Sequence, residues 1–334
     1  MERRTIGATA LGVGAIGLGC MPMSWAYSRS EQRGDRSLRT VHAALDAGVS
    51  LLDTADMYGP FTNELLVGRA LKERRSEAFV STKCGLLVGD GGERRHVVAN
   101  GRPGYVRRAC DASLRRLQTD VIDLYQLHRA DPEVPVEETW GAMAELVSAG
   151  KVRALGLCAV GPARSGAGPI RTRERSANWT GSSRSSRWRR WRRSCRCGPR
   201  SRWRGSSLVR GAGRRLPRGH AAGERLPHRD ADPGRRLRAG RPAGPAPRFT
   251  AEMMAANQPI VAGLRRVAAR HGAGVTPAQV ALAWVLGLGR HVVPVPGAKR
   301  ERWAVENARA ASLRLTAEDL AEIAALPAPR GSWD

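Results

Sequence analysis

Short apolar runs alternate with amphipathic stretches along the first half of the chain. Runs typical of buried strands occupy residues 13–19, 49–53, 78–82, 121–127 and 152–157. Between them, helical spacing covers residues 37–47, 63–71, 103–117 and 135–150. In the second helix, Asn63 is the expected N-cap, and Leu65, Leu66 and Leu71 are expected to face inward. This alternation of strand and helix predicts a parallel α/β barrel.

The same pattern returns near the C-terminus. Helices are predicted at 257–271 and at 276–287, where Thr276 is the expected N-cap and Pro277 takes the first helical position. Residues 291–295 are the predicted eighth strand, and two closing helices are expected at 302–311 and 317–326. The sequence therefore accounts for strands one to five and strand eight of a (β/α)8 barrel.

Residues 161–247 break the pattern. They contain no run of four apolar residues and no helical periodicity, and they are rich in Arg, Gly, Pro, Ser and Trp. A barrel needs its sixth and seventh strands here, and this composition favours disorder over buried strands. We therefore predict a single barrel domain, 1–334, that contains an Arg-rich insert at 161–247.

The positive charge is concentrated in that insert. The whole chain has a net charge of +26, and residues 161–247 hold 24 arginines, no lysine and four acidic residues, a net charge of +20. Only +6 remains for the rest of the chain, so we expect no specific nucleic-acid partner for the barrel. Residues 184–204 interleave arginine with Trp188, Trp191 and Trp203, which leaves a nucleic-acid-binding segment as the alternative function.

Cysteine usage and the N-terminus bear on location. No paired spacing suits zinc among Cys20, Cys84, Cys110, Cys158, Cys195 and Cys197. Arg3 and Arg4, followed by small residues up to Cys20, faintly resemble an export signal, although the same stretch fits the first strand. No stretch reaches the ~20 apolar residues of a membrane span. We expect a cytoplasmic protein with reduced thiols, no metal site and no membrane partner; an oligomeric state does not follow from the sequence.

Four side chains with complementary chemistry lie where predicted strands end. Asp53, Lys83 and His128 each end a strand, and Tyr58 follows one of them by five residues. The carboxyl ends of barrel strands meet at one face, where barrel active sites lie. A phenol with its ordinary pKa of ~10 is a weak acid, so a catalytic tyrosine needs a cation and hydrogen-bond partners nearby. Lys83 and His128 are candidates for that help.

Nine strings, in chain order, resemble the aldo-keto reductase family. They are GAIGLGCMPMS (14–24), LLDTADMYG (51–59), NELLVGRAL (63–71), STKCG (81–85), ACDASLRRL (109–117), DLYQLH (123–128), GKVRALGL (150–157), TPAQVALAW (276–284) and VVPVPGAKR (292–300). They cover about residues 5–158 and 249–325. The resemblance implies a (β/α)8 barrel that reduces an aldehyde or ketone to an alcohol with NADPH.

The resemblance also implies roles for the four strand-end residues. Tyr58 would be the general acid that protonates the carbonyl oxygen. Lys83 would lower the pKa of Tyr58, and Asp53 would hold Lys83. His128 would orient the substrate oxygen or share in proton transfer.

A nicotinamide cofactor would be held without a GxGxxG turn, because the glycines at 12–17 open no helix. By resemblance, Gly19, Cys20 and Met21 would lie by the nicotinamide. The phosphate and adenine end would be held by Gly297, Lys299, Arg300, Glu306 and Asn307. Lys299 and Arg300 together favour a 2′-phosphate, hence NADPH. Trp25 could line the substrate pocket or could be a surface anchor.

The chain also departs from the family. Cys158 and Ala159 stand where the family usually has Ser and then Asn or Glu, and residues 161–247 lack the strand-six Gln and the strand-seven aromatic that stacks on nicotinamide. The chain as written is therefore predicted to bind NADPH weakly and to close its barrel poorly. The composition of 161–247 is what GC-rich coding DNA yields in a wrong frame, so we interpret this segment as a reading-frame slip.

Overall fold

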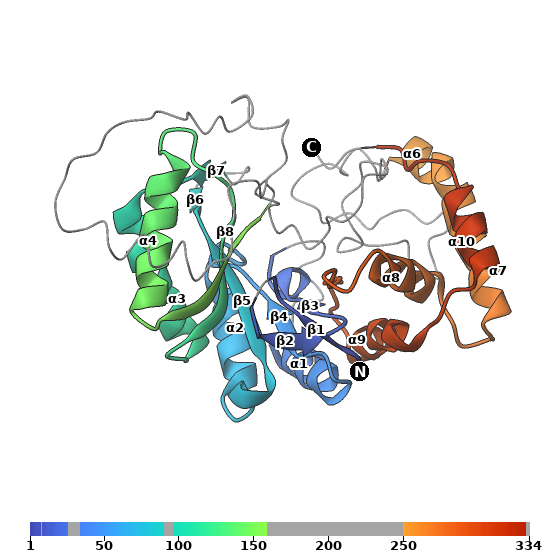
Figure 1. The fold of residues 1–334 in the computed structure, drawn as a ribbon, viewed down its shortest axis with the longest axis horizontal. Coiled ribbons are helices and arrows are strands. Elements are labelled where there is room, and N and C mark those ends of the chain that lie inside the picture. Colours follow the sequence, from blue (N-terminus) through green and yellow to red (C-terminus); the bar gives the residue numbers. More distant parts are fainter. Residues whose placement is uncertain (8, 26–33, 90–95, 159–249, 332–334) are drawn as a thin grey trace.

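A parallel sheet forms the centre of the molecule. The computed structural model describes residues 1–7, 9–25, 34–89, 96–158 and 250–331. Its sheet has the strand order β3-β4-β5-β8-β9 (Figure 1). The strands are β3 (Leu18–Gly19), β4 (Leu51–Asp53), β5 (Phe79–Cys84), β8 (Ile122–Leu127) and β9 (Val152–Leu157). They fall on the first five predicted barrel strands, in order; the segment expected to hold strands six and seven lies outside the described residues.

Helices cover the outer side of this sheet (Figure 1). They are α1 (Gly34–Asp46), α2 (Thr62–Leu71), α3 (Pro103–Leu117) and α4 (Val136–Ser148). Val41, Val67, Val106 and Met143 are fully buried from these four helices and join the largest hydrophobic cluster. Apolar residues at helical spacing therefore face the sheet, as predicted.

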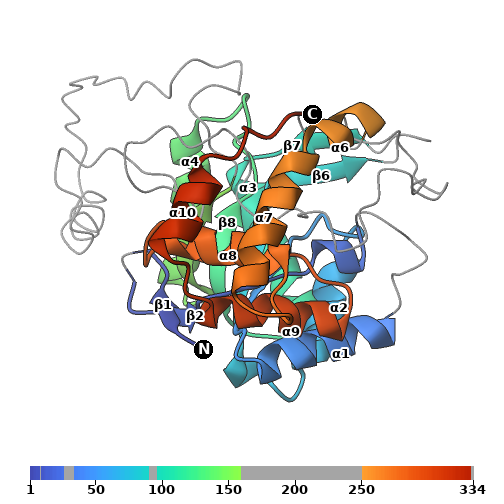
Figure 2. The same cartoon turned by 90° about the vertical axis from the view of Figure 1, so that its right-hand side faces the viewer.

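The C-terminal part adds α6 (Ala251–Ala256), α7 (Gln258–Arg270), α8 (Pro277–Gly287), α9 (Glu301–Arg309) and α10 (Ala317–Ala324). Thr276 caps α8, because its hydroxyl accepts a hydrogen bond from Gln279 N and Gln279 Oε1 accepts one from Thr276 N. Helix α9 packs on α1, and α10 packs on α7 (Figure 2). The C-terminal helices thereby extend the layer that α1 begins.

The predicted eighth strand is not a regular strand in the structure. Residues 291–295 form no strand, although Val292 and Val293 are fully buried, and among the described residues the ladder contact next to this segment is an isolated bridge between Gly19 and Gly297. Pro294 and Pro296 have no N–H to donate, although their carbonyls accept hydrogen bonds from Gly17 N and Gly19 N at 2.9 and 3.0 Å. The two hydrogen bonds place the segment beside β3 without a complete ladder between them.

The predicted first strand, 13–19, is divided in the structure. Its beginning, β2 (Gly12–Gly14), pairs with β1 (Arg3–Thr5) in an antiparallel hairpin, and only β3 joins the sheet. From the hairpin segment, Ile6 and Val13 pack against Leu51 and Phe79, the first residues of β4 and β5. The hairpin therefore covers the amino-terminal end of the sheet.

Arg4 anchors this hairpin to the C-terminal half. Its guanidinium is buried and donates hydrogen bonds from NH1 to the carbonyl oxygens of Leu286, Gly289 and Val292, at 3.2, 2.9 and 2.5 Å. The arginine pair that resembles an export signal therefore belongs to the folded domain.

Two expectations about α2 are wrong. The helix begins after Phe61, so Asn63 is not its N-cap. The buried face starts with Asn63 and Glu64 and continues with Val67, which turns Leu65 outward with 44% of its surface exposed. Glu64, Val67 and Leu71 are spaced three and four residues apart and share the inward face, and Leu65 lies outside that face.

A hairpin that the sequence did not predict follows β5. It consists of β6 (Leu86–Gly89) and β7 (His96–Ala99), paired antiparallel. Leu86 is buried, whereas Leu87, Val97 and Val98 are exposed. The hairpin stands beyond the carboxyl end of the sheet (Figures 1 and 2).

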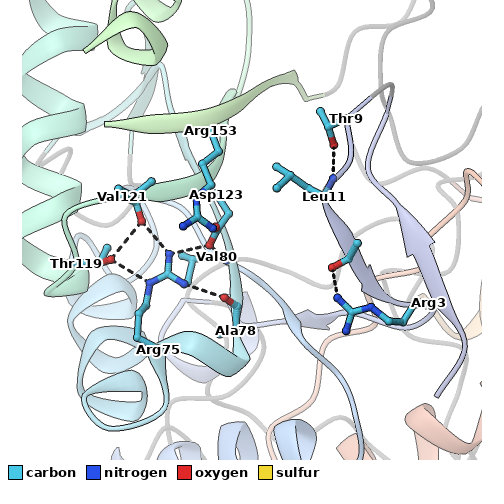
Figure 3. A network of polar contacts seen from close by, with 11 residues as sticks. Arg3, Thr9, Leu11, Arg75, Ala78, Val80, Thr119, Val121, Asp123 and Arg153 are labelled. Carbon is cyan, nitrogen blue, oxygen red and sulfur yellow. Dashed lines mark hydrogen bonds and ion pairs between the residues drawn. The ribbon is translucent and has the colours of Figure 1, made fainter. Parts of the chain in front are cut away.

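A buried carboxylate ties three elements together near the amino ends of the central strands (Figure 3). Asp123 of β8 is 1% exposed and accepts hydrogen bonds from Arg75, Arg153 and Val80 N at 2.7, 2.6 and 2.8 Å. Arg75 also donates to Thr119 Oγ1 and to the carbonyl oxygens of Ala78 and Val121. The network fixes the start of β5 against β8 and β9.

Membrane-spanning helices and metal-binding clusters are both absent from the described part of the chain. No helix there has the length and apolar character needed to cross a membrane. No group of three or more His, Cys, Asp or Glu side chains gathers there in a way that could hold a metal ion.

Candidate active site

An ion pair lies at the carboxyl end of the sheet. Lys83 Nζ donates to Asp53 Oδ2 at 2.5 Å and to the carbonyl oxygen of Thr54 at 2.8 Å. The other carboxylate oxygen of Asp53 accepts from Ser81 Oγ at 2.8 Å. Burial lowers the pKa of Lys83, but the charge of Asp53 and the hydrogen bond to Asp53 act against burial, and the pKa is held above its ordinary value. Lys83 is therefore a permanent cation at neutral pH.

Tyr58 lies on the loop between β4 and α2, next to that cation. It is 8% exposed, and Lys83 Nζ lies 5.3 Å from the centroid of its ring. Burial raises the pKa of Tyr58 to about 12, while the charge of Lys83 opposes the rise. The lysine acts in the expected direction, but burial is the larger effect in this structure. Tyr58 therefore holds its proton at neutral pH.

The backbone after Tyr58 requires glycine. Gly59 has a φ of 67°, and a Cβ there would lie 2.2 Å from Thr62 Oγ1 and 2.9 Å from Ser24 Cβ. A left-handed conformation with this little space excludes other residues. The turn directs the chain from Tyr58 into α2.

His128 completes the group from the end of β8. Its ring meets the Tyr58 ring edge-on, with 6.0 Å between centroids and 83° between planes. Burial and the charges of Lys83 and Arg129 lower the pKa of His128 to about 3, so the imidazole is neutral. Its Nδ1 is buried without a hydrogen-bond partner among the described residues. A neutral imidazole with a free ring nitrogen can bind a substrate oxygen or a proton.

Cys158 borders this group where the sequence departs from the family. It follows β9, and its N–H donates to the carbonyl oxygen of Leu127 at 2.8 Å. The side chain is half-buried, and burial raises the pKa of its thiol although Lys83 lowers it. The thiol therefore stays protonated beside Lys83.

The residues predicted at the nicotinamide lie in a tightly tied loop. Cys20 N donates to the carbonyl oxygen of Asp53 at 2.9 Å, and Cys20 is fully buried. A Cβ on Gly19 would lie 3.1 Å from the carbonyl oxygen of Val295, and a Cβ on Gly297 would lie 2.7 Å from Pro22. Glycines thus let the chain after 295 approach the loop after β3 closely.

Asn63 is the site residue that sequence reasoning missed most clearly. Its Nδ2 donates to the carbonyl oxygen of Cys20 at 2.9 Å and to Ser24 Oγ at 2.5 Å. Its Oδ1 accepts from Thr54 Oγ1 at 2.7 Å. Asn63 therefore joins the loop after β3 to the end of β4. The sequence shows Asn63 at the start of an apolar helix, and a helix N-cap accounts for an asparagine at that position equally well.

The predicted phosphate residues gather around the start of α9. Arg300 precedes the helix, and its guanidinium carbon lies 5.0 Å from the ring centroid of Trp303. Lys299 is buried, with 2% exposed. Basic residues before a helix N-terminus are suited to an anion.

The two predicted adenine-end residues are both half-buried on α9. Glu306 accepts a hydrogen bond from Thr276 Oγ1 at 2.7 Å, and Asn307 follows it directly. Glu306 therefore has a structural contact with the N-cap of α8 beside its predicted role.

An apolar wall adjoins Tyr58. Ala55, Met57 and Leu86 are buried in one cluster with Tyr58, and Met21, Trp25, Val88 and Ala99 pack on it partly buried. Trp25 therefore packs beside Tyr58, which favours the hypothesis that it lines the substrate pocket over the hypothesis that it is a surface anchor.

Comparison with known proteins identifies the family. The model of the Aldo/keto reductase family matches residues 15–165 and 216–328. The second match begins inside 161–247, so the unmatched stretch between the two matches is 166–215. A probable aldo-keto reductase 1 from Glycine max is 35% identical over 323 residues, covering 95% of this chain and 86% of the relative.

Solved structures show the same fold. The glycerol dehydrogenase AKR11B4 from Gluconobacter oxydans has a TM-score of 0.62 and 25% identity, covering 97% of this chain and 94% of that one. The holo form of aldo-keto reductase AKR11C1 from Bacillus halodurans has a TM-score of 0.60 and 24% identity, covering 99% and 98%. An aldo-keto reductase from Klebsiella pneumoniae in complex with NADPH has a TM-score of 0.56 and 24% identity, covering 97% and 94%. The chain belongs to the aldo/keto reductase family.

Proposed function

We propose that this chain reduces an aldehyde or ketone to an alcohol with NADPH, using Tyr58 as the general acid. The observation that carries the proposal is the cluster at the carboxyl end of the sheet. There a protonated phenol lies beside a lysine fixed by a carboxylate and beside a neutral histidine. Family membership supports the same reaction class.

The proton transfer follows from the states of these groups. Tyr58 keeps its proton until the carbonyl oxygen gains negative charge, and then donates it from Oη. The phenolate that remains is stabilised by Lys83, whose own charge is secured by Asp53. His128, with a free ring nitrogen, holds the substrate oxygen at the phenol. The carbonyl carbon receives a hydride and the oxygen receives the proton, which yields the alcohol.

NADPH, when bound, supplies the hydride. The residues present fit such a cofactor: Lys299 and Arg300 precede the N-terminus of α9, and Gly19 and Gly297 let the chain after residue 295 lie against the loop expected to hold the nicotinamide. We propose that Cys20 and Met21 line the nicotinamide end and that Glu306 and Asn307 serve the adenine end. The basic pair favours the 2′-phosphate of NADPH over NADH.

The wider setting is proposed on two further observations. Cys20, Cys84, Cys110 and Cys158 are free thiols, which suits the reducing cytoplasm. The Arg- and Trp-rich residues 184–204 lie outside the described residues and within the stretch without a family match, so nothing favours the nucleic-acid alternative.

The test is the variant Tyr58→Phe in an assay of NADPH consumption with simple aldehydes and ketones. Because the phenylalanine cannot donate a proton, we expect kcat to fall by about 10²–10⁴, with NADPH affinity unchanged by fluorescence quenching. Tyr125→Phe is the matched control, since Tyr125 is a fully buried tyrosine of the main core cluster. A wild-type chain that consumes no NADPH, or equal rates in Tyr58→Phe and wild type, would contradict the proposal.

A further inference from the structure

Asp56 is a buried carboxyl that the reaction does not use. It is 1% exposed and lies on the loop between β4 and α2, two residues before Tyr58. Its N–H donates to the carbonyl oxygen of Lys83 at 3.1 Å, and its carbonyl oxygen accepts from Phe61 N at 2.9 Å. The backbone of Asp56 is therefore tied to β5 on one side and to the start of α2 on the other.

The carboxyl of Asp56 is only partly satisfied. Oδ2 accepts a hydrogen bond from the Tyr105 hydroxyl of α3 at 3.1 Å, while Oδ1 has no hydrogen-bond partner among the described residues. Two other buried carboxylates, Asp123 and Glu64, differ. Asp123 accepts from two arginines and a backbone N–H, and Glu64 accepts from Arg116 and from Thr82 Oγ1. Only Asp56, of these three, lacks a cationic hydrogen-bond partner.

Titratable and charged groups approach Asp56 from four elements. They are Glu64 of α2, Tyr105 and Arg116 of α3, Cys84 of β5 and Tyr125 of β8. Burial and the charge of Glu64 raise the pKa of Asp56 to about 7, against the hydrogen bonds from Tyr105 and Met57 N and the charge of Arg116. Both protonation states are therefore populated at neutral pH.

This arrangement is costly for a purely structural residue. A buried carboxyl without a cation destabilises a fold, and an amide or an apolar side chain of the same size avoids that cost. Such groups are concentrated at functional sites. Here the carboxyl lies in the short loop that carries Asp53 at one end and Tyr58 at the other.

We propose that Asp56 and Tyr105 form a positioning pair, in which the buried carboxyl fastens α3 to the loop between β4 and α2 and sets where that loop presents Tyr58. Protonated Asp56 can donate to a neighbouring acceptor, whereas the ionised form can only accept. The two forms therefore hold the loop differently. The link to activity rests on the proposed role of Tyr58, but the loop position itself does not.

The experiment follows Tyr58 directly by NMR of ring-labelled tyrosine in the full chain. The sequence has only four tyrosines, and the Tyr58→Phe variant assigns the signal. We expect the Tyr58 resonance to shift with a midpoint of about pH 7 without substrate. In Asp56→Asn, which keeps the side-chain volume, the resonance should not depend on pH between about 5 and 9.

Tyr105→Phe gives a directional control. It removes the hydrogen bond that favours ionised Asp56, so the midpoint should move upward by about one pH unit. A wild-type Tyr58 signal without pH dependence, or the same midpoint in Asp56→Asn, would overturn the proposal. An inactive chain with the expected NMR shifts would overturn the proposed function alone.

Folding is checked in the same samples. Because the pKa of Asp56 is raised in the folded state, its contribution favours folding below its unfolded pKa of about 4 and is lost as pH rises through about 7. Asp56→Asn should therefore unfold at no lower denaturant concentration than wild type at pH 8. A lower midpoint there would mean that the ionised carboxyl stabilises the fold, and this would overturn the argument that only a positioning role accounts for it.

Discussion

At the scale of single residues, burial and the charge of Lys83 act in opposite directions on the pKa of Tyr58 and Cys158 and in the same direction on the pKa of His128. Burial favours the neutral forms of Tyr58, His128 and Cys158, and Lys83 supplies the one charge that acts on all three. Each pKa unit corresponds to a difference of about 1.4 kcal/mol between the protonated and deprotonated forms of a group. Shifts of this kind decide which form is present at neutral pH. The site therefore combines neutral donors with a fixed cation, which suits proton donation to a carbonyl oxygen.

His128 gives a prediction about pH dependence. Because burial and Lys83 lower its pKa to about 3, it should not titrate between pH 5 and 8. Any inflection of kcat near pH 7 should therefore persist in His128→Gln, although the rate is reduced, and should disappear in Asp56→Asn. Steady-state profiles of the three proteins test this, and loss of the inflection in His128→Gln would assign it to the imidazole.

At the scale of elements, polar anchors hold pieces whose backbone pairing is incomplete. Asp123 fastens the start of β5 to β8 and β9, and Asn63 ties the loop after β3 to the end of β4. Arg4 does the same between the N-terminal hairpin and the segment around Val292, where prolines prevent a complete ladder. Asn63 acts at the strand ends that carry the site, whereas Asp123 and Arg4 act toward the amino-terminal end of the sheet.

The Asp123 anchor predicts a stability change. Asp123→Asn leaves Arg75 and Arg153 without their charge partner, and we expect a loss of about 3 kcal/mol in the free energy of unfolding. Asp111→Asn is the control, because the Asp111–Lys151 pair is about 40% exposed at both side chains and should contribute about 0–1 kcal/mol. Urea unfolding measures both; similar losses in the two variants would show that burial of Asp123 does not matter.

At the scale of the whole molecule, two separated parts of the sequence build one site. Residues from β3 to β9 supply the candidate acid and its partners, and the chain around Gly297 lies against the loop after β3. The family match has the same two-part form, with residues 166–215 between its parts. The stretch that falls between the matches is also the most arginine-rich part of the sequence.

Resequencing the coding DNA over about residues 150–255 tests the reading-frame hypothesis. We expect a missing or an extra base at each end of the unmatched stretch, since a frame change explains both its abrupt limits and its composition. An intact frame would contradict the hypothesis. In that case the chain as written should bind NADPH weakly and unfold without a single cooperative transition, as calorimetry and NADPH titration would measure.

The sequence by itself determined the order of the five strands of the parallel sheet, the helices between them and the four residues gathered at the strand ends. The periodicity of apolar residues indicates which side chains face inward, and the carboxyl ends of parallel strands all lie at the same edge of the sheet. Helix α3 spans the predicted residues, and Asp53, Tyr58, Lys83 and His128 lie together, although their roles stay predictions.

Only the tertiary structure decided which partner each polar atom finds. Asn63 fits a helix cap locally, but it bonds to Cys20 and Ser24 instead, and Asp56 meets Tyr105 forty-nine positions away. The predicted eighth strand has the expected apolar pattern. Its pairing with β3 depends on whether the carbonyl groups of Pro294 and Pro296 point toward β3, because proline has no N–H to donate. Hydrogen bonds require contact within about 3 Å, and chain spacing does not record distances between remote residues.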